Sequence, residues 1–409
     1  MAVSLRLATI GARFVAIYIF ARYLSVHAFG QYGLLAATIA FCVYAVGFDF
    51  YSYSTRQIIV SDRERWPMFL KSHANFSLLT YGVVLPVVSV MFLVGWLPIQ
   101  LYVWFLLLLP LEHSCLEADR VLVAMGHQQA ASLAAFIRQG LLLLALAPLL
   151  WLDPGSRSLA TVLLAWIAFD AASLVFSVAV IRRVSTWGSA RVTVDWSWVR
   201  SGVRTSSVFL IGTLCLRALF TADRQLVSLW SSAGVLGAYT LFMSLAAGIS
   251  SVIASGIHQF LYPSLVASAS RHDRPAFYRG LWALTWQTLA TLIVLSAGLA
   301  VASHQVLLAI GKDEYLALAW MLPWVLVAVG LFNISLIPHY GMYALHLDRH
   351  IMTVTAVSTA AFFVSAFALS ELGAVTAVLS GISIGCSILL VGKSLILYRN
   401  LHLLDAPQA

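Results

Sequence analysis

The chain has 409 residues, of which 61% are hydrophobic and only 10% are charged, and its formal net charge is +8. A soluble protein needs about 25% charged residues to cover its core, whereas the mean hydropathy of this chain is +0.91. The composition therefore predicts an integral membrane protein and excludes a soluble multidomain enzyme.

The N-terminal segment predicts a first membrane helix rather than a cleavable signal peptide. Arg13 interrupts the apolar stretch that a signal peptide needs, and no small-x-small cleavage site follows it. The four cysteines stand singly in apolar runs without metal-ligand spacing, so we interpret them as small buried apolar side chains. They are Cys42, Cys115, Cys215 and Cys386.

Twelve apolar segments are long enough to cross a bilayer core, which needs about 20 residues per helix. Sixteen of the 24 lysines and arginines fall on one side of these segments and four on the other, which predicts that both termini are cytoplasmic. The predicted fold class is an all-α polytopic membrane protein with about 12 transmembrane helices in two six-helix lobes. The segments lie near residues 5–23, 33–54, 76–97, 101–120, 130–151, 158–181, 204–222, 235–257, 281–302, 316–337, 350–370 and 373–396.

The longest loop, which joins the sixth and seventh segments, predicts the boundary between two halves. It is rich in arginine and contains Trp187, Trp196 and Trp198, so we expect it to lie as an amphipathic connector on the anionic cytoplasmic leaflet. The predicted organisation is an N-lobe at 1–185, a connector at 186–203 and a C-lobe at 204–409.

A short motif repeats in the two halves. Ser25, Gly30 and Tyr32 follow the first segment with the same spacing as Ser232, Gly237 and Tyr239 after the seventh, 207 residues later. The two glycines are expected to allow a tight turn, and the tyrosines suit the membrane interface. Two six-helix halves related by an axis along the membrane normal are typical of transporters, with the substrate path between the halves.

Polar side chains at membrane depth form stripes on the first, second, seventh and eighth segments. Ionisable groups at this depth usually face an aqueous cavity, and the same two positions carry stripes in both halves, so the pattern predicts a shared cavity. The stripes are Arg6, Thr9 and Arg13; Asp49, Ser52 and Arg56; Ser206, Thr213, Arg217, Thr221 and Arg224; and Ser244, Ser251, Ser255 and His258.

Three further ionisable residues lie near mid-depth in the N-terminal half: Glu112, Arg138 and Asp170. Arg138 and Asp170 are equally well explained as a structural ion pair between neighbouring helices, and Asp49 with Arg56 as a charge pair at a helix end. His258 more often serves helix packing than proton transfer. Arginine offers a planar, permanently charged fork that matches phosphate, so the stripes favour an anionic substrate.

These residues also carry a resemblance. Ala21-Arg22-Tyr23-Leu24-Ser25 and Phe29-Gly30-Gln31-Tyr32-Gly33-Leu34 resemble the first-half signature of the Wzx-type polysaccharide flippases of the MOP superfamily. Asp223-Arg224-Gln225, Gly237-Ala238-Tyr239 and Tyr262-Pro263-Ser264-Leu265 resemble their second-half pattern. One departure is Gly47-Phe48-Asp49-Phe50, which replaces the family's usual ending of the second helix.

The resemblance implies a MATE-like fold in the bacterial inner membrane. It implies a flippase that moves undecaprenyl-diphosphate-linked oligosaccharide to the periplasmic leaflet by alternating access, in O-antigen, lipopolysaccharide or exopolysaccharide synthesis. Arg13 and Arg217 would then lie where cationic residues of the lumen attract the diphosphate or acidic sugars, and Arg138 and Arg224 are the further cavity candidates.

We expect no cofactor beyond a coupling ion, either H⁺ or Na⁺, for which Glu112, Asp49 and Asp170 are equal candidates; Asp223 is a further coupling or structural carboxylate. The expected partners are the lipid-linked oligosaccharide, membrane lipids, and the polysaccharide polymerase and chain-length regulator of such a pathway, with no nucleic acid. One alternative function is a proton- or sodium-coupled multidrug-type antiporter. Another is a membrane enzyme of the same glycan pathway, against which the short outer loops argue.

Overall fold

The computed structural model describes residues 2–185 and 193–404, and throughout these ranges the regular structure is helical. Ten of the described helices are long and apolar enough to cross a membrane, and an eleventh span is counted when a bent pair of helices is taken as one. Contacts between residues divide the chain into two compact units, at 1–214 and 215–409. Each unit is described by itself.

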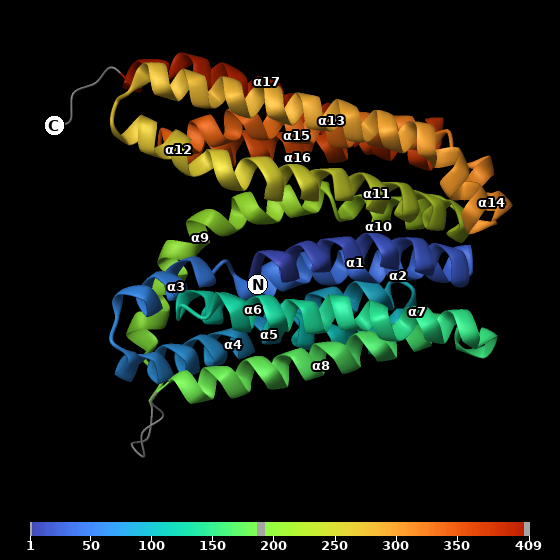
Figure 1. The fold of residues 1–409 in the computed structure, drawn as a ribbon, viewed down its shortest axis with the longest axis horizontal. Helices are drawn as coiled ribbons and strands as arrows, with labels where there is room; N and C mark the ends of the chain where they lie inside the picture. Colours follow the sequence, from blue (N-terminus) through green and yellow to red (C-terminus); the bar gives the residue numbers. More distant parts are fainter. Residues whose placement is uncertain (1, 186–192, 405–409) are drawn as a thin grey trace. The chain divides into compact units, whose positions relative to one another are not determined.

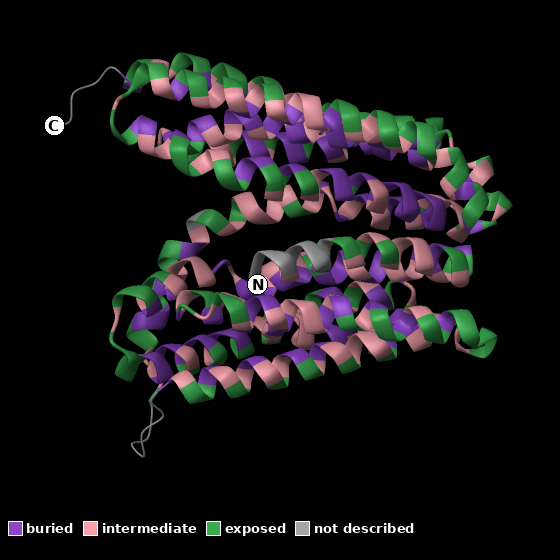
Figure 2. Cartoon of the chain, in the orientation of Figure 1, coloured by how far each residue is buried: buried purple, intermediate pink, exposed green. Residues whose placement is uncertain are grey.

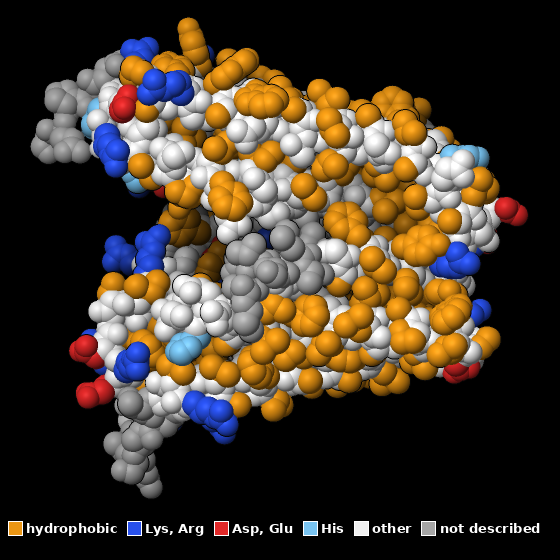
Figure 3. All heavy atoms as spheres, in the orientation of Figure 1, with side chains coloured by type: hydrophobic (Ala, Val, Ile, Leu, Met, Phe, Trp, Pro, Cys, Tyr) orange, Lys and Arg blue, Asp and Glu red, His pale blue; other side chains and the backbone are white. Residues whose placement is uncertain are grey.

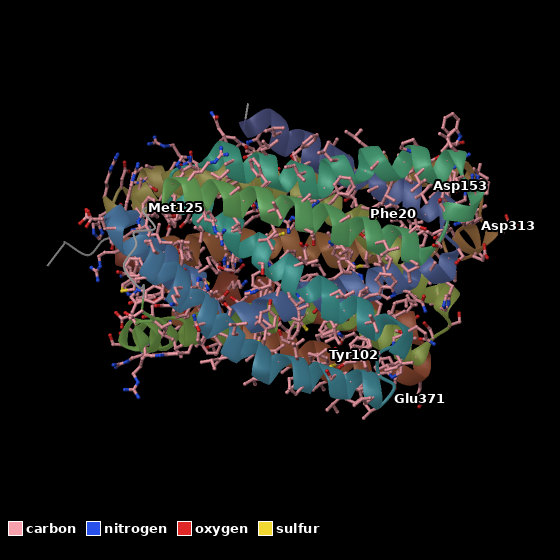
Figure 4. The ribbon with its side chains drawn as sticks, turned by 90° about the horizontal axis from the view of Figure 1, so that it is seen from below. Phe20, Tyr102, Met125, Asp153, Asp313 and Glu371 are labelled. Atoms are coloured by element: carbon pink, nitrogen blue, oxygen red, sulfur yellow. The ribbon has the colours of Figure 1, made fainter. Side chains whose placement is uncertain are left out.

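The N-terminal unit consists of helices that run lengthwise beside one another (Figure 1). Helix α5 crosses the whole unit, because Tyr102 and Met125 lie at opposite ends of it (Figure 4). A π-helical turn, η3, interrupts the fifth span between α6 and α7. The helices are α1 (Ala2–Tyr23), α2 (Val26–Gly47), α3 (Tyr51–Val60), α4 (Trp66–Leu93), α5 (Tyr102–Ala124), α6 (Gln128–Phe136), η3 (Ile137–Leu141), α7 (Leu142–Leu152) and α8 (Leu159–Val184).

The C-terminal unit repeats the plan of long lengthwise helices, and it too contains a π-helical turn, η5, within its second span. Helix α9 (Trp196–Leu219) begins in the first unit and ends in the second. The remaining helices are α10 (Ala222–Trp230), α11 (Ala233–Ile253), η5 (Ala254–His258), α12 (Gln259–Ser270), α13 (Arg274–Ile310), α14 (Asp313–Ala317), α15 (Met321–Ala344), α16 (Asp348–Ala368) and α17 (Ala374–Arg399).

Each unit exposes apolar side chains along the length of its helices (Figures 2 and 3). Leu93 and Val175 of the first unit and Val301 and Val364 of the second are each exposed over 70% or more of their surface. Large apolar exposure of this kind requires a hydrocarbon solvent. In both units, Lys and Arg gather at one end, where the charge bias predicts the cytoplasm. The chain is a multi-pass membrane protein.

The predicted segments correspond to helices, but several boundaries differ. The second helix ends at Gly47 rather than at residue 54, because Phe48 and Asp49 adopt left-handed backbone conformations with φ of 53° and 51°. Asp49 therefore lies in a break before α3 and not on the second span. The third span begins ten residues earlier than predicted, at Trp66, and the eighth continues through η5 to Ser270.

The repeated serines have the same local role in both halves. Ser25 accepts a hydrogen bond from the Ala28 N–H at 3.1 Å and Ser232 from the Val235 N–H at 3.4 Å, so each caps the helix that follows. The prediction that Gly30 and Gly237 allow a tight turn is wrong: both are buried inside α2 and α11, and neither has a positive φ.

Part of the predicted connector, residues 186–192, lies outside the described residues. The rest leads into α9, whose first turn is capped by Asp195: its carboxylate accepts hydrogen bonds from the Trp198 N–H at 2.9 Å and the Ser197 hydroxyl at 2.7 Å. Trp198 is buried and stacks on Phe69, with ring centroids 5.0 Å apart. This end of α9 is therefore fastened to the first unit.

An Asp195→Ala variant should destabilise the start of α9 by about 1 kcal/mol, the usual cost of losing an N-cap. The hydrogen bonds from Ser197 and the Trp198 N–H lower the pKa of Asp195, so the cap contributes above the unfolded-state pKa and is lost as acid protonates it. The difference in thermal unfolding between wild type and variant should be present at pH 7 and shrink below about pH 4. A difference that is independent of pH would contradict this role.

Candidate functional site

A buried arginine bridges two carboxylates inside the N-terminal unit. The Arg138 guanidinium lies 2.5 Å from the Glu112 carboxylate and 3.3 Å from that of Asp119. Glu112 and Asp119 are seven residues apart on α5, so they project from one face two turns apart. Arg138 is carried by η3, and π-helical turns of this kind occur often at functional sites. We call these three residues the arginine bridge.

Arg13 lies beside the arginine bridge on the middle of α1. Its Nε donates a hydrogen bond to the Gln139 Oε1 at 2.7 Å, and the charges that act on it are those of Arg138, Glu112 and Tyr32. The side chain is exposed, and no described carboxylate lies within 4.0 Å of its guanidinium. The hydrogen bond that Arg13 makes within the described residues is therefore to a neutral amide and not to a carboxylate.

Asp170, on α8, is fully buried near the same place. The charged groups that act on it are Glu112 and Arg138, and its carbonyl oxygen accepts a hydrogen bond from the Cys115 thiol at 3.3 Å. The structural ion pair considered between Arg138 and Asp170 is replaced by the pairs of Arg138 with Glu112 and Asp119. Asp170 thus adds a third acidic group to the surroundings of a single arginine.

A second charged group on α5 was not found from the sequence. Glu117 binds Arg120 at 2.5 Å and lies 3.7 Å from the His73 ring, while the Arg120 guanidinium stacks 3.6 Å from the Tyr51 ring centroid. The spacing of Glu117 and Arg120, three residues apart, was a signal for a helical ion pair. Both residues fall at the end of the predicted 101–120 segment.

In the C-terminal unit the candidate carboxylate Asp223 is bound by neighbouring side chains. Asp223 is fully buried and accepts a hydrogen bond from the Tyr239 hydroxyl at 2.8 Å, and Arg224 lies 3.4 Å away. Arg224 also donates to the Phe220 carbonyl at 3.2 Å. Arg217 is exposed on α9. The two tyrosines of the repeated motif have different surroundings. Tyr239 binds a carboxylate, whereas Tyr32 packs against the Trp166 ring, with centroids 5.9 Å apart.

A Tyr239→Phe variant should test this contact. Removing the hydroxyl leaves one oxygen of the buried Asp223 carboxylate without its donor, which costs about 1–3 kcal/mol. Thermal unfolding should therefore occur several degrees lower. Tyr32→Phe is the matched control in the other half, and an equal effect in both variants would contradict a special role for the Asp223 contact.

Three basic side chains also lie inside the C-terminal unit: Lys393 on α17, His339 on α15 and His258 at the end of η5. Lys393 and His258 are each only 1% exposed. The Lys393 charge acts on His339, and His258 also acts on it. The sequence had singled out only His258 of these three, and we call them the basic cluster.

Comparison with known proteins identifies the fold. No protein-family model and no curated protein matches the chain. A solved structure of the inward-facing conformation of a multidrug resistance MATE family transporter of the MOP superfamily matches with a TM-score of 0.79 at 12% identity, covering 98% of this chain and 96% of that one. A MATE structure in complex with MaD3S matches at 0.58 and 12% identity, with 98% and 94% covered.

A third match, to MATE in the bent conformation, has a TM-score of 0.56 at 14% identity and covers 99% of this chain and 95% of that one. At this level of identity the likeness shows the fold alone. The chain thus has the same fold as these solved transporters over nearly its whole length, in agreement with the predicted fold class.

Proposed function

We propose that the protein is a flippase for lipid-linked oligosaccharides, which moves an undecaprenyl-diphosphate-linked repeat unit between the leaflets of the bacterial inner membrane. The substrate class follows from the signature that contains Ser25, Gly30 and Tyr32, together with the chemistry of the arginines. The fold supports a transporter but does not choose its substrate.

The observation that carries the proposal is the state of Arg13. The positive charge of Arg138 is already balanced by Glu112 and Asp119. Arg13, in contrast, is exposed at the middle of a membrane helix, and the hydrogen bond that it makes within the described residues is to the neutral Gln139 amide. An arginine held in place by a neutral group keeps its charge for an anion, and its planar fork matches a diphosphate.

The same network argues against a cationic substrate. A multidrug-type antiporter needs a carboxylate that is accessible to the cation. Glu112 and Asp119 are bound to Arg138, Asp223 is bound to Tyr239, and Asp170 is fully buried. Anion transport therefore fits these residues better, with Arg217 as the corresponding exposed arginine of the second unit. A coupling ion, H⁺ or Na⁺, supplies the energy in this proposal.

The test is transfer of a lipid-diphosphate-linked fluorescent oligosaccharide in proteoliposomes, scored by how fast the sugar becomes accessible to a membrane-impermeant quencher. Arg13→Ala should slow protein-dependent transfer by about tenfold or more, because a charge-assisted contact to the diphosphate is lost. Arg13→Lys should recover only part of the rate, since lysine lacks the fork.

Arg22→Ala is the matched control. This arginine lies on the same helix, is exposed and binds the Tyr18 hydroxyl at 2.9 Å, so its removal should leave the rate within about twofold of wild type. Full activity of Arg13→Ala would remove Arg13 from the substrate path. Efflux of an organic cation with no oligosaccharide transfer would assign the protein to the multidrug-type antiporters.

A further inference from the structure

The basic cluster crosses the interior of the C-terminal unit from α17 to α13. His258 Nε2 lies 3.3 Å from the Thr288 hydroxyl on α13, and the His258 ring packs on Tyr340 with centroids 5.0 Å apart. His339 precedes Tyr340 on α15 and interacts electrostatically with both His258 and Lys393. His258 therefore packs on α15, the helix that carries His339.

The packing of α17 on α15 places Lys393 and His339 at the same level. Gly341 of α15 lies so close to Leu397 that an added Cβ would meet its Cδ2 at 2.7 Å, and Lys393 is one helical turn before Leu397 on the same face. His339 is two residues before Gly341, so the lysine and the histidine lie at about the same level along the two packed helices. Lys393 is six residues before the end of α17, yet it is only 1% exposed and does not reach the surface.

No carboxylate balances this lysine. Within residues 2–185 and 193–404, none lies within 4.0 Å of the Lys393 ammonium. Cys386 on α17 and His339 on α15 are the titratable groups whose charges couple to it. The other helices packed on α17 supply little charge near Lys393. The buried residues of α16 are apolar or hydroxylic. Asp223 and Arg224 of α10 lie at the opposite end of the unit, beside the start of α11.

The remaining titratable neighbours are three phenols and, beyond them, Asp348 at the start of α16, whose charge acts on Tyr262. Tyr340 and Tyr343 of α15 and Tyr262 of α12 form a chain of ring contacts with centroids 5.4 Å and 5.6 Å apart, which ends at His258. The Nδ1 atoms of His258 and His339 are buried and make no hydrogen bond. Within the described residues, the cluster thus offers two histidine nitrogens without a hydrogen bond and an amine with no carboxylate within 4.0 Å.

Few of the basic groups in such a buried cluster can be protonated at the same time. Removing a cation from water without a counter-ion is costly, and a second positive charge a few ångströms away would add repulsion. We propose that Lys393, His339 and His258 form a proton-binding site that carries no more than one positive charge at a time. The proton binds the lone pair of one nitrogen and leaves it when the site opens to the other side of the membrane.

The role of the cluster in energy coupling rests on the proposed transport function. Its ability to bind a proton does not depend on that function. Coupling follows if the transport conformations differ in whether water reaches Lys393, because the charged amine is stable only where water or an anion solvates it. The C-terminal unit would then bind the coupling proton while the N-terminal unit binds the anionic substrate.

The chain has only three lysines, Lys71, Lys312 and Lys393, so the site can be observed directly. Protein labelled with ¹⁵N at lysine Nζ should give three resonances in detergent, and Lys393→Met should remove the one that belongs to the cluster. We expect this resonance to change with pH between about pH 5 and pH 9, and the change to shift in His339→Gln. A Lys393 resonance that is constant over this range would overturn the proposal, whether or not any substrate is transported.

Lys312 is the internal reference. It lies in the turn after α13, where burial lowers the pKa of its side chain to about 8, so its resonance also titrates and is assigned with Lys312→Met. Since Lys312 lies outside the cluster, its titration should be the same in wild type and His339→Gln. A shift of the Lys312 titration in that variant would show a general effect of the substitution and not a coupled site.

The coupling step is tested in proteoliposomes that transfer the labelled oligosaccharide with and without a pH gradient. Wild-type transfer should be accelerated by the gradient, and the acceleration should be lost in Lys393→Met and in Lys393→Arg, whose guanidinium cannot release its proton, while exchange without a gradient continues. Lys312→Met should respond as wild type. Unchanged acceleration in Lys393→Met would overturn the coupling role, and absence of transfer in wild type would instead contradict the proposed substrate.

Discussion

Arg138→Met should lower the free energy of unfolding of the N-terminal unit by about 3–5 kcal/mol, the cost of breaking a buried ion pair by removing one partner. The substitution keeps most of the side-chain volume but leaves Glu112 and Asp119 without their shared cation, with Asp170 fully buried nearby. Thermal unfolding of the purified protein in detergent should shift down by roughly 10 °C.

Two variants separate this effect from a general loss of arginine. In the triple variant Glu112→Gln, Asp119→Asn, Arg138→Met, the arginine and both carboxylates that pair with it are replaced by neutral groups, so most of the stability should return. Arg22→Met removes an exposed arginine and should leave the unfolding temperature nearly unchanged. An Arg138→Met protein that unfolds at the wild-type temperature would mean that the arginine bridge does not stabilise the unit.

Most membrane-spanning helices could be predicted from the sequence, because each is an apolar run long enough to cross a bilayer; ten or eleven of the described helices meet this condition, against the twelve predicted. Helix ends were harder, since they depend on single residues: Phe48 and Asp49 turn the chain at positive φ, and nothing in a run of aromatic residues indicates that α2 stops there. The serines of the repeated motif were correctly seen as equivalent positions. The places of Gly30 and Gly237 could not be predicted, because a glycine inside a buried helix and a glycine in a turn look alike in a sequence.

The site could be predicted only in part. The sequence predicted that Glu112 and Arg138 lie at membrane depth, and in the structure they form an ion pair. Arg138 pairs with Asp119 as well, rather than with Asp170. Spacing along α5 indicates which carboxylates share a face, whereas the partner of that face depends on how η3 and α8 pack on it. Helix periodicity carries no information about that packing.

Lys393 shows a different limit. It lies six residues from the end of α17, a position from which lysine side chains commonly extend to the membrane surface. The sequence alone therefore predicts an ordinary interfacial lysine and gives no sign of its burial. In the structure α15 and α16 pack against α17, and the Lys393 side chain is buried. The two units thereby differ in kind: the first pairs its buried arginine with carboxylates, and the second buries basic groups with no carboxylate among the described residues near them.

This difference predicts opposite responses to the removal of a buried cation. Lys393→Met should raise the stability of the C-terminal unit, because methionine fills a similar volume and removes an amine that no carboxylate balances. The expected gain is roughly 1–4 kcal/mol, the range found when buried charged groups are replaced by apolar side chains. Thermal unfolding in detergent should therefore shift up by several degrees.

Lys71→Met is the control, since Lys71 is exposed on α4 and its loss should change the unfolding temperature little. The gain in Lys393→Met should come with loss of acceleration by a pH gradient, because natural proteins retain destabilising groups where function requires them. If Lys393→Met unfolds at a lower temperature than wild type, the lysine stabilises the unit through a contact of its own, and the amine is a structural group rather than a site for the coupling proton.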